Sequence, residues 1–307
     1  MSKVTVVGAG FVGATTAQRL VEKDLADVVM IDVVEGLPQG KALDMMESAP
    51  IEGFKSKIVG SNDYKDTQNS DIVVVTAGIA RKPGMTRDDL VNTNAGIVGS
   101  VVTEAVKYSP KAIFVIVSNP LDVMTYLAWK KTGLDTKRVF GMAGALDSAR
   151  MAYFIAEAAG CLPSEVDATV LGGHGDEMVP VPALTKVKGK SITEVLKADK
   201  IEAINQRTRD GGAEIVKYLK TGSAFYAPSS SVVRMVSAIL QDKGEVIPSC
   251  VYLTGQYGLK DVYCGVPAKL GKGGVKEVVE VKLSPAEKEA LQKSAEHVRE
   301  NCAKLNL

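Results

Sequence analysis

The first half of the 307-residue chain alternates short, almost wholly apolar segments with segments of helical apolar spacing. Strands are predicted at residues 4–7, 28–31, 57–59, 72–76, 113–117 and 138–140. Strands that are apolar throughout are typical of a parallel sheet covered on both faces. Amphipathic segments at 14–23 and 88–108 would supply covering helices, so the pattern predicts a doubly wound α/β sheet.

The pattern changes after residue 143. A helix is predicted over Gly144–Ala159, and Gly160 suits the position just past its end. Short strands at 168–171, 178–181 and 185–188, helices near 200–220 and 229–242, and a hairpin near 262–282 follow. We therefore expect two domains, residues 1–143 with the parallel sheet and residues 144–307 with an α+β fold, joined without a long linker.

The last predicted helix has a complete start signal. Ser284 would be its N-cap, Pro285 its first residue and Glu287 the partner in a capping box. From Leu291 onwards apolar residues recur at spacings of four and three, and His297 falls outside this stripe. We expect His297, one of two histidines in the chain, to be a solvated surface residue.

Composition narrows the function classes. Apolar residues make up 46% and charged residues 24%, and 37 Lys and Arg against 36 Asp and Glu leave no overall charge to attract nucleic acid or a membrane. The four cysteines have neither metal-ligand nor disulfide-like spacing, so no metal is expected. With no signal-peptide pattern and no apolar run near the roughly 18 residues of a membrane span, we expect a cytoplasmic protein.

The segment VTVVGAGFVGATTAQRL places Gly8, Gly10 and Gly13 directly after a predicted strand and at the start of a helix. In a dinucleotide site such glycines make the turn, leave room for the pyrophosphate and let the helix pack closely. Asp32 ends the second strand, where a carboxylate accepts hydrogen bonds from ribose hydroxyls and repels the extra phosphate of NADP. The combination predicts an NAD-binding Rossmann domain, with a plain glycine turn and an unrelated surface aspartate as the alternative.

A cluster of cations follows the fourth predicted strand, in TAGIARKPGMTRDDL. Arg81 and Arg87 flank a Pro-Gly pair that can act as a hinge. Thr86 and Asp89 resemble a capping pair, which places Arg87 at the first helical position, where a cation opposes the helix dipole. This unfavourable placement indicates a functional role for Arg87. The alternative is that these cations are only the solvated charges of a basic surface loop.

Three further groups are candidates for acid–base and anion-binding chemistry. Asp147 and Arg150 lie three residues apart on a predicted helix, so they share a face, as a plain surface ion pair also would. Asn119 precedes a proline at the carboxyl end of the sheet, where such sheets bind ligands, although Asn-Pro also forms turns. His174 lies in LGGHGDEM, and the glycines on both sides would leave room for substrate and nicotinamide to meet the imidazole.

Together these segments resemble the lactate/malate dehydrogenase family over essentially the whole chain. The resemblance rests on VGAGFVG, the strand end at Asp32, ARKPGMTRDDL, VSNPLD, LDSAR and GGHGDEMVP, in this order. It implies a Rossmann doubly wound parallel sheet followed by an α+β catalytic domain, with NAD as the cofactor. Family members with arginine at the position of Arg81 act on malate and those with glutamine on lactate, so the expected substrate is a small dicarboxylate, malate or oxaloacetate.

The resemblance also implies roles for single residues. His174 would exchange the proton of the substrate hydroxyl while Asp147 orients it, and Arg87 would polarise the carbonyl. Arg81 and Arg150 would bind the two carboxylates, and the substrate oxygen would accept a hydrogen bond from Asn119. Cofactor contacts would come from Gly8, Ala9, Gly10, Phe11, Val12, Gly13, Asp32, Asn94, Val117, Ser118 and Asn119.

Two alternatives stay open. A lactate or other 2-hydroxy-acid dehydrogenase would leave one of three arginines unpaired in a closed site, at a cost of about 2–5 kcal/mol. A non-catalytic NAD-binding structural or redox-sensing protein would not need His174, Asp147 and Arg150 together. We also expect a homo-oligomer, either a dimer or a tetramer, and a place in the tricarboxylic acid cycle.

Overall fold

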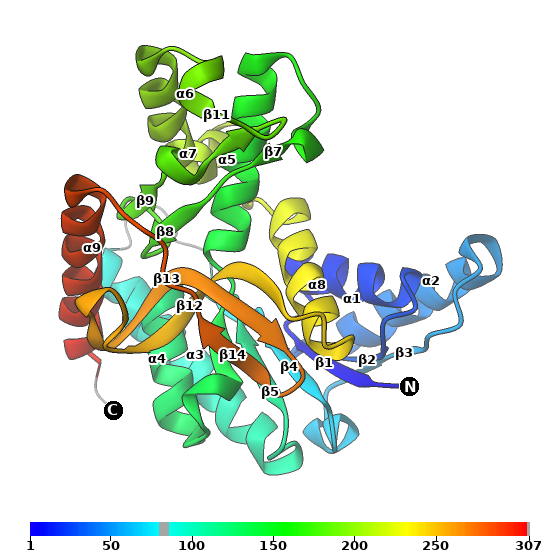
Figure 1. The fold of residues 1–307 in the computed structure, drawn as a ribbon. Helices are drawn as coiled ribbons and strands as arrows, with labels where there is room; N and C mark the ends of the chain where they lie inside the picture. Colours follow the sequence, from blue (N-terminus) through cyan, green and yellow to red (C-terminus); the bar gives the residue numbers. More distant parts are fainter. Residues whose placement is uncertain (80–85, 306–307) are drawn as a thin grey trace.

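The computed structural model describes residues 1–79 and 86–305, and its N-terminal half is a parallel sheet with the strand order β3-β2-β1-β4-β5-β6 (Figure 1). The strands are β1 (Lys3–Val7), β2 (Asp27–Ile31), β3 (Ile58–Ser61), β4 (Ile72–Val75), β5 (Ile113–Ile116) and β6 (Val139–Gly141). The helices of this half are α1 (Phe11–Glu22), α2 (Leu37–Glu52), α3 (Arg87–Tyr108) and α4 (Leu121–Thr132). The strand order reverses between β1 and β4, as in a doubly wound nucleotide-binding sheet, so the predicted fold class is confirmed here.

Alternate residues of the central strands enter two different cores, which explains why these strands are apolar throughout. In β4, Ile72 and Val74 pack with α1 and α8 (Tyr226–Leu240), whereas Val73 and Val75 pack with α3 and α4. All four side chains are completely buried. Because helices cover both faces of the sheet, neither set of positions can be polar.

The C-terminal half adds antiparallel strands to the same sheet. The other elements of this half are α5 (Gly144–Ala159), β7 (Val166–Asp167), β8 (Val170–Gly172), β9 (Met178–Pro180), β10 (Lys186–Val187), β11 (Lys190–Ser191), α6 (Ile192–Val195), α7 (Ala198–Leu219), β12 (Glu245–Thr254), β13 (Lys260–Gly271), β14 (Gly274–Val278) and α9 (Pro285–Ala303). β12 pairs with β6 at Cys250 and Gly141, and β13, β8 and β9 follow outward. β7, β10 and β11 form a small separate sheet in the upper lobe of Figure 1, next to α6 and α7. The predicted α+β fold is confirmed, but one sheet runs through both halves.

Local start and stop signals gave the most accurate boundaries. α5 has the predicted bounds, with Gly160 in the left-handed region at φ 64°. The capping box of α9 is present, because the Ser284 hydroxyl accepts from the N–H of Glu287 and the Glu287 carboxylate accepts from the N–H of Ser284. The hairpin of β13 and β14 is also confirmed.

The sequence pattern missed α2, α4 and β12. Within α2 only Pro38 and Ala42 are buried, so this helix has no continuous apolar stripe to reveal it. In α4 the first five residues, Leu121 to Thr125, are all buried, so this helix has no polar face at its start to reveal the helical period. Neither helix therefore has the half-apolar, half-polar period by which a helix is recognised in a sequence.

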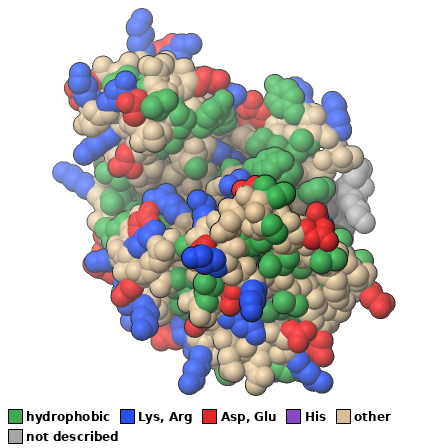
Figure 2. Space-filling model, turned by 90° about the vertical axis from the view of Figure 1, so that its right-hand side faces the viewer, with side chains coloured by type: hydrophobic (Ala, Val, Ile, Leu, Met, Phe, Trp, Pro, Cys, Tyr) green, Lys and Arg blue, Asp and Glu red, His purple; other side chains and the backbone are tan. Residues whose placement is uncertain are grey.

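The surface in Figure 2 carries acidic and basic side chains interspersed, and it is hollowed between the upper lobe and the rest of the molecule. Among the described residues, no helix is long and apolar enough to cross a membrane. The same residues contain no group of three His, Cys, Asp or Glu side chains placed to hold a metal ion.

Candidate active site

The turn between β1 and α1 has the geometry of a phosphate cradle. Gly8 has φ 103°, a value that favours glycine, and a Cβ on Gly13 would lie 1.8 Å from the Gly8 carbonyl oxygen. No described atom lies within 4 Å of the place where a Cβ of Gly10 would stand. Gly10 is the N-cap of α1 and has no side chain to accept a hydrogen bond from the first N–H groups of the helix. These N–H groups can therefore bind an anion.

Two charged side chains fix this turn from the second strand and the second helix. The Asp32 carboxylate accepts from the N–H of Ala9 at 2.7 Å and from the N–H of Val34 at 3.0 Å. Nζ of Lys41 donates to the Ala9 carbonyl oxygen at 2.7 Å. The residues present thus fit a dinucleotide, with open space at Gly10 and a half-buried carboxylate at the strand end. Lys41 was missed because it lies on α2.

The residues after β5 form the neighbouring edge of the sheet. Val117 and Asn119 line a cleft of about 350 Å³, and the Ser118 hydroxyl donates to the Ala77 carbonyl oxygen at 2.6 Å. Asn94 of α3 is only 1% exposed, and its amide donates to the Asn119 carbonyl oxygen at 2.7 Å. The Asn94 side chain therefore fixes the backbone at Asn119 by a hydrogen bond. A direct contact between Asn94 and the cofactor stays a prediction.

The cleft lies between the dinucleotide turn, at Val12, and residues of the C-terminal half. It is lined by Val12, Val117, Asn119, Met142, Leu146, Arg150, His174, Gly175, Asp176, Met178, Arg209, Asp210, Gly212, Ala213, Val216, Ser223, Ala224 and Pro228. Of the predicted site residues, it therefore brings together Val12, Val117 and Asn119 with Arg150 and His174. The contributions of α7, including Arg209, were missed by sequence reasoning.

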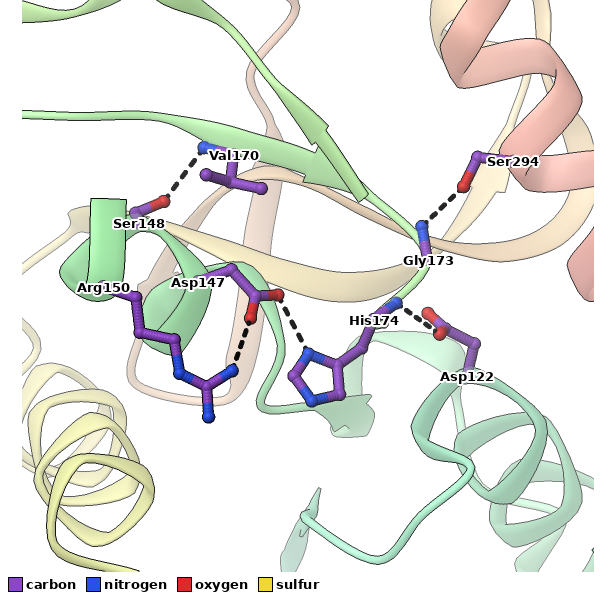
Figure 3. Close-up of polar contacts among 8 residues, drawn as sticks. All are labelled: Asp122, Asp147, Ser148, Arg150, Val170, Gly173, His174 and Ser294. Carbon is purple, nitrogen blue, oxygen red and sulfur yellow. Dashed lines mark hydrogen bonds and ion pairs between the residues drawn. The ribbon is translucent and has the colours of Figure 1, made fainter. Parts of the chain in front are cut away.

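His174 and Asp147 form a hydrogen-bonded pair at this cleft (Figure 3). Nδ1 of His174 lies 2.9 Å from Oδ2 of Asp147, with 17% of the His174 side chain and 2% of the Asp147 side chain exposed. Burial by itself would lower the pKa of His174, but the charge and hydrogen bond of Asp147 outweigh it and raise the pKa. Nε2 is on the side of the ring that points away from Asp147, so it is the nitrogen suited to proton exchange.

Arg150 adds a cation next to this pair. Its guanidinium lies 3.5 Å from Oδ1 of Asp147, and its side chain is 11% exposed. Burial lowers the pKa of Arg150, and the charge of Asp147 opposes that change. Among the residues that the structure describes, none gives Nε of Arg150 a hydrogen-bond partner. A half-satisfied guanidinium at a cleft is suited to binding an anionic ligand.

Of two adjacent glycines inside α7, Gly211 makes room for Arg150, and Gly212 lies at ordinary contact distance from it. A Cβ on Gly211 would lie 3.2 Å from Cδ of Arg150, and one on Gly212 would lie 3.9 Å from a guanidinium nitrogen. Glycine in a helix interior costs about 1 kcal/mol relative to alanine, so a Gly-Gly pair there needs a reason. That pair is the sequence signal that could have found the contribution of α7.

The expectation that all the glycines around His174 make room for ligands is wrong for two of them. A Cβ on Gly172 would lie 2.9 Å from the Glu177 carbonyl oxygen, and one on Gly173 would lie 3.2 Å from Cγ2 of Val298. These two glycines allow close packing against the protein's own chain. Only Gly175, with φ 122° and no described atom near its Cβ position, borders the cleft in the expected way.

His297 is also not the fully solvated residue that was expected. It is half-buried on α9 and lines a second hollow of about 280 Å³ behind His174. Asp122 and Asn301 border the same hollow. The two histidines of the chain therefore lie in one region, although only His174 lines the main cleft.

The predicted substrate loop lies largely outside the described residues. Arg81 falls there, as do Lys82 and the Pro83-Gly84 pair, so the role of Arg81 stays a prediction. Arg87 is the first residue of α3, and the expected capping box of this helix is confirmed by bonds between Thr86 and Asp89. The side chain of Arg87 lies outside what the structure describes, and its role likewise stays a prediction.

Comparison with known proteins identifies the family. Residues 2–141 match the NAD binding domain of lactate/malate dehydrogenases, and residues 144–306 match their alpha/beta C-terminal domain. The chain belongs to the lactate/malate dehydrogenase family. Because the matched NAD binding domain contains the glycine turn and Asp32, the prediction of NAD as the cofactor is confirmed.

Relatives within the lactate/malate dehydrogenase family include both activities. A malate dehydrogenase from Pelodictyon phaeoclathratiforme is 57% identical, covering 99% of this chain and 98% of its own. The structure of Cryptosporidium parvum malate dehydrogenase is 45% identical with a TM-score of 0.97, covering 99% and 98% of the two chains. A C. parvum lactate dehydrogenase, solved with lactic acid and NAD, is 40% identical with a TM-score of 0.95, covering 98% and 97%. The family fold alone therefore does not choose the substrate.

Proposed function

We propose that this chain is an NAD-dependent malate dehydrogenase, which interconverts (S)-malate and oxaloacetate by reversible hydride transfer. The observation that carries the proposal is the Asp147–His174 pair next to Arg150. His174 and Arg150 line a cleft that is also lined by Val12 of the dinucleotide turn. The names of relatives at 52–57% identity support malate as the substrate. The arginine at position 81 supports it independently.

NAD, when bound, supplies the hydride acceptor or donor. In malate oxidation, His174 accepts the hydroxyl proton at Nε2 while the hydride leaves C2, and the proton returns to the carbonyl oxygen in the reverse reaction. Asp147 accepts the hydrogen bond from Nδ1 and stabilises the imidazolium that forms. Arg150 binds the C1 carboxylate with its planar guanidinium.

The substrate loop supplies the remaining charges in this proposal. Arg81 pairs with the second carboxylate of the dicarboxylate, and the Pro83-Gly84 hinge closes over the substrate to exclude water. Arg87 polarises the reacting carbonyl and stabilises the negative charge that develops on its oxygen. Asn119 donates a hydrogen bond to the same oxygen.

The direct test is a comparison of oxaloacetate and pyruvate reduction, each with NADH and with NADPH, followed by absorbance of the reduced cofactor. We expect kcat/KM to be highest for oxaloacetate with NADH, because Asp32 repels the NADP phosphate and pyruvate leaves a cation unpaired. A higher kcat/KM for pyruvate would assign the chain to the lactate-type alternative. The similar fold of the C. parvum lactate dehydrogenase is compatible with that alternative. Failure to oxidise NADH with any 2-oxo acid would favour the non-catalytic alternative.

We also propose that residues 1–143 form the NAD-binding Rossmann domain and residues 144–307 the substrate-binding domain. The ranges matched by the two family domains and the start of α5 at Gly144 support this division. Separate expression of residues 1–143, followed by an NADH-binding titration, tests it. Loss of folding in the fragment would show that the shared sheet makes the halves inseparable.

A homo-oligomer, dimer or tetramer, is part of the proposal. Leu43 and Ile51 of α2 are 61% and 85% exposed, which supports burial of this helix against a second copy. Light scattering of the purified protein measures the mass in solution, and a mass of one chain would contradict the proposal. We further propose that the enzyme is cytoplasmic, which its four free cysteine thiols support, and that it acts in the tricarboxylic acid cycle.

A further inference from the structure

The backbone around His174 is held by side chains from two distant helices. His174 lies between β8 and β9, and the flanking Gly172 and Gly175 both have positive φ. The N–H of Gly173 donates to the Ser294 hydroxyl of α9 at 2.8 Å, and the N–H of His174 donates to the Asp122 carboxylate of α4 at 2.9 Å (Figure 3). Two consecutive N–H groups are thus fixed by side chains 121 and 52 residues away.

Both acceptors are buried and closely packed. Asp122 is 5% exposed and Ser294 is 1% exposed. At Gly173 a Cβ would lie 3.4 Å from both the Asp122 carboxylate and the Ser294 hydroxyl, and closer still to Val298. Side chains of both helices therefore pack closely against the residue that precedes His174. The imidazole moves with this backbone, and its Nδ1 lies at hydrogen-bond distance, 2.9 Å, from Oδ2 of Asp147. A shift of the backbone would therefore weaken or break that hydrogen bond.

Asp122 differs from Ser294 because it also carries a titratable group. Burial raises the pKa of Asp122, whereas the N–H of His174 and the neighbouring Cys250 thiol oppose that rise. The charge of Asp122 also acts to raise the pKa of His174. In the described part of the chain, the other charged and titratable groups around these two residues are Asp147 and Arg150 of α5, Cys264 of β13, His297 and Cys302 of α9, and Asp176 and Glu177 of the loop after His174.

We propose that Asp122 and Ser294 are positioning residues for His174, which fix the Gly173–His174 backbone so that Nδ1 stays on Asp147 and Nε2 stays at the cleft. The proposal rests on the proposed role of His174 in proton exchange. Ser294 acts through its hydrogen bond alone, whereas Asp122 acts through a hydrogen bond and a charge. Asn at position 122 can keep the acceptor and remove the charge, so the two contributions can be separated.

The chain offers a matched control for Ser294. The Ser148 hydroxyl of α5 accepts from the N–H of Val170, at the other end of β8, at 3.0 Å, and Ser148 is 7% exposed (Figure 3). Ser148→Ala therefore removes the same kind of buried bond at the start of β8, without touching Gly173 or His174, which follow the end of that strand. Thermal midpoints of Ser148→Ala and Ser294→Ala show whether the two losses of stability are comparable.

The two histidines of the chain make a direct readout possible. In protein labelled with ¹⁵N-histidine, NMR reports the tautomer and titration of each imidazole, and His297→Asn assigns the two signals. We expect Ser294→Ala to change the tautomer signal of His174 and to lower kcat about tenfold or more, with the Kd for NADH unchanged. We expect Ser148→Ala to leave the His174 signal and kcat near those of the original protein.

Asp122→Asn tests the charge separately. We expect the His174 tautomer to be kept and its titration midpoint to move to lower pH, because the carboxylate no longer favours the imidazolium. An unchanged His174 signal in Ser294→Ala, or equal changes in Ser294→Ala and Ser148→Ala, would overturn the proposal. The NMR readout needs no substrate, so it tests positioning even if neither oxaloacetate nor pyruvate is reduced and the proposed function fails.

Discussion

The dinucleotide turn and the His174 site both hold a glycine-rich segment of backbone, but they do so over very different distances along the chain. The turn spans Gly8 to Gly13, and the acid that fixes it is 23 residues from Ala9. The His174 segment is fixed by Asp147, Asp122 and Ser294, which lie 27, 52 and 121 residues from their partners. The carboxylate that fixes the turn belongs to the same β-α-β unit, whereas the side chains that fix the His174 segment come from three separate helices.

This difference decides what each site needs in order to form. The turn depends on backbone sterics, because side chains on Gly8 or Gly13 would meet backbone or Thr76 within 3 Å. The His174 site depends on the docking of α4, α5 and α9 around one loop. Damage to either site should therefore have different consequences for folding and for turnover, and the following changes test that comparison.

The largest expected effect is on the assembled site. His174→Asn removes the only histidine that lines the main cleft, so kcat should fall by about 10²–10⁴-fold. The dinucleotide turn is built separately, so the Kd for NADH, measured by fluorescence titration, should be unchanged. Retained turnover would remove His174 from the mechanism, and lost NADH binding would show that the two sites are not independent.

Asp147→Asn should have the next largest effect, also within about 10²–10⁴-fold in kcat, because an amide no longer favours the imidazolium. It should also change the pH profile. The pKa of His174 is raised above its ordinary 6.5 by Asp147, so oxaloacetate reduction, which uses the protonated ring, should persist above that pH. In the variant the high-pH fall should begin at lower pH; an unchanged profile would contradict the assigned cause.

The same pKa shift has a consequence for stability. Since the folded pKa of His174 is raised, the pair stabilises the fold fully below about 6.5, and this contribution is lost as the pH rises through the folded value. Urea unfolding at a series of pH values measures it. In Asp147→Asn the burial of His174 remains and lowers its pKa, so the slope attributable to His174 should reverse its sign.

Arg81→Gln tests the substrate assignment. Removing a cation that pairs with the second carboxylate should lower the ratio of kcat/KM for oxaloacetate to kcat/KM for pyruvate. The expected change corresponds to about 2–5 kcal/mol in the relative activation free energy. NADH binding should again be unaffected. An unchanged ratio would remove Arg81 as the residue that selects a dicarboxylate.

The dinucleotide turn can be tested with a matched pair of variants. Gly13→Ala places a Cβ 1.8 Å from the Gly8 carbonyl oxygen, so it should destabilise the protein by about 1–3 kcal/mol and impair NADH binding. Gly10→Ala meets no described atom, so it should keep the thermal midpoint but weaken NADH binding by roughly tenfold, because the methyl occupies space meant for the pyrophosphate. Equal stability of the two variants would contradict the steric interpretation.

The smallest expected effect concerns the helix that carries Ser294. Ser284→Ala removes the N-cap of α9 and should cost about 1 kcal/mol, measured as a lower urea midpoint with unchanged slope. Turnover should be nearly unchanged, because Ser294 lies in the middle of the helix. A large loss of kcat would mean that the start of α9 contributes directly to holding the His174 loop.

Motifs with local causes were predicted well. Gly160 at the end of α5 and Ser284 at the start of α9 occupy their expected positions because helix ends need particular backbone angles or hydrogen-bond acceptors. By contrast, Gly172 and Gly173 were interpreted as space for ligands, since sequence does not show that Ser294 and Val298 of α9 approach them. Lys41, Asp122 and Arg209 were missed because each reaches its site from an element or face that periodicity did not reveal.

The sequence by itself determined the strand–helix alternation of the first half, the NAD turn with Asp32, and the choice of His174, Asp147 and Arg150 as a group. These depend on short-range sterics, on residue chemistry, or on motifs that lie close together in the chain. Only the tertiary structure decided that one sheet joins the two halves, and that Asp122 and Ser294 hold the His174 backbone. Such contacts join residues more than fifty positions apart, and only the packing of whole helices and strands brings them together.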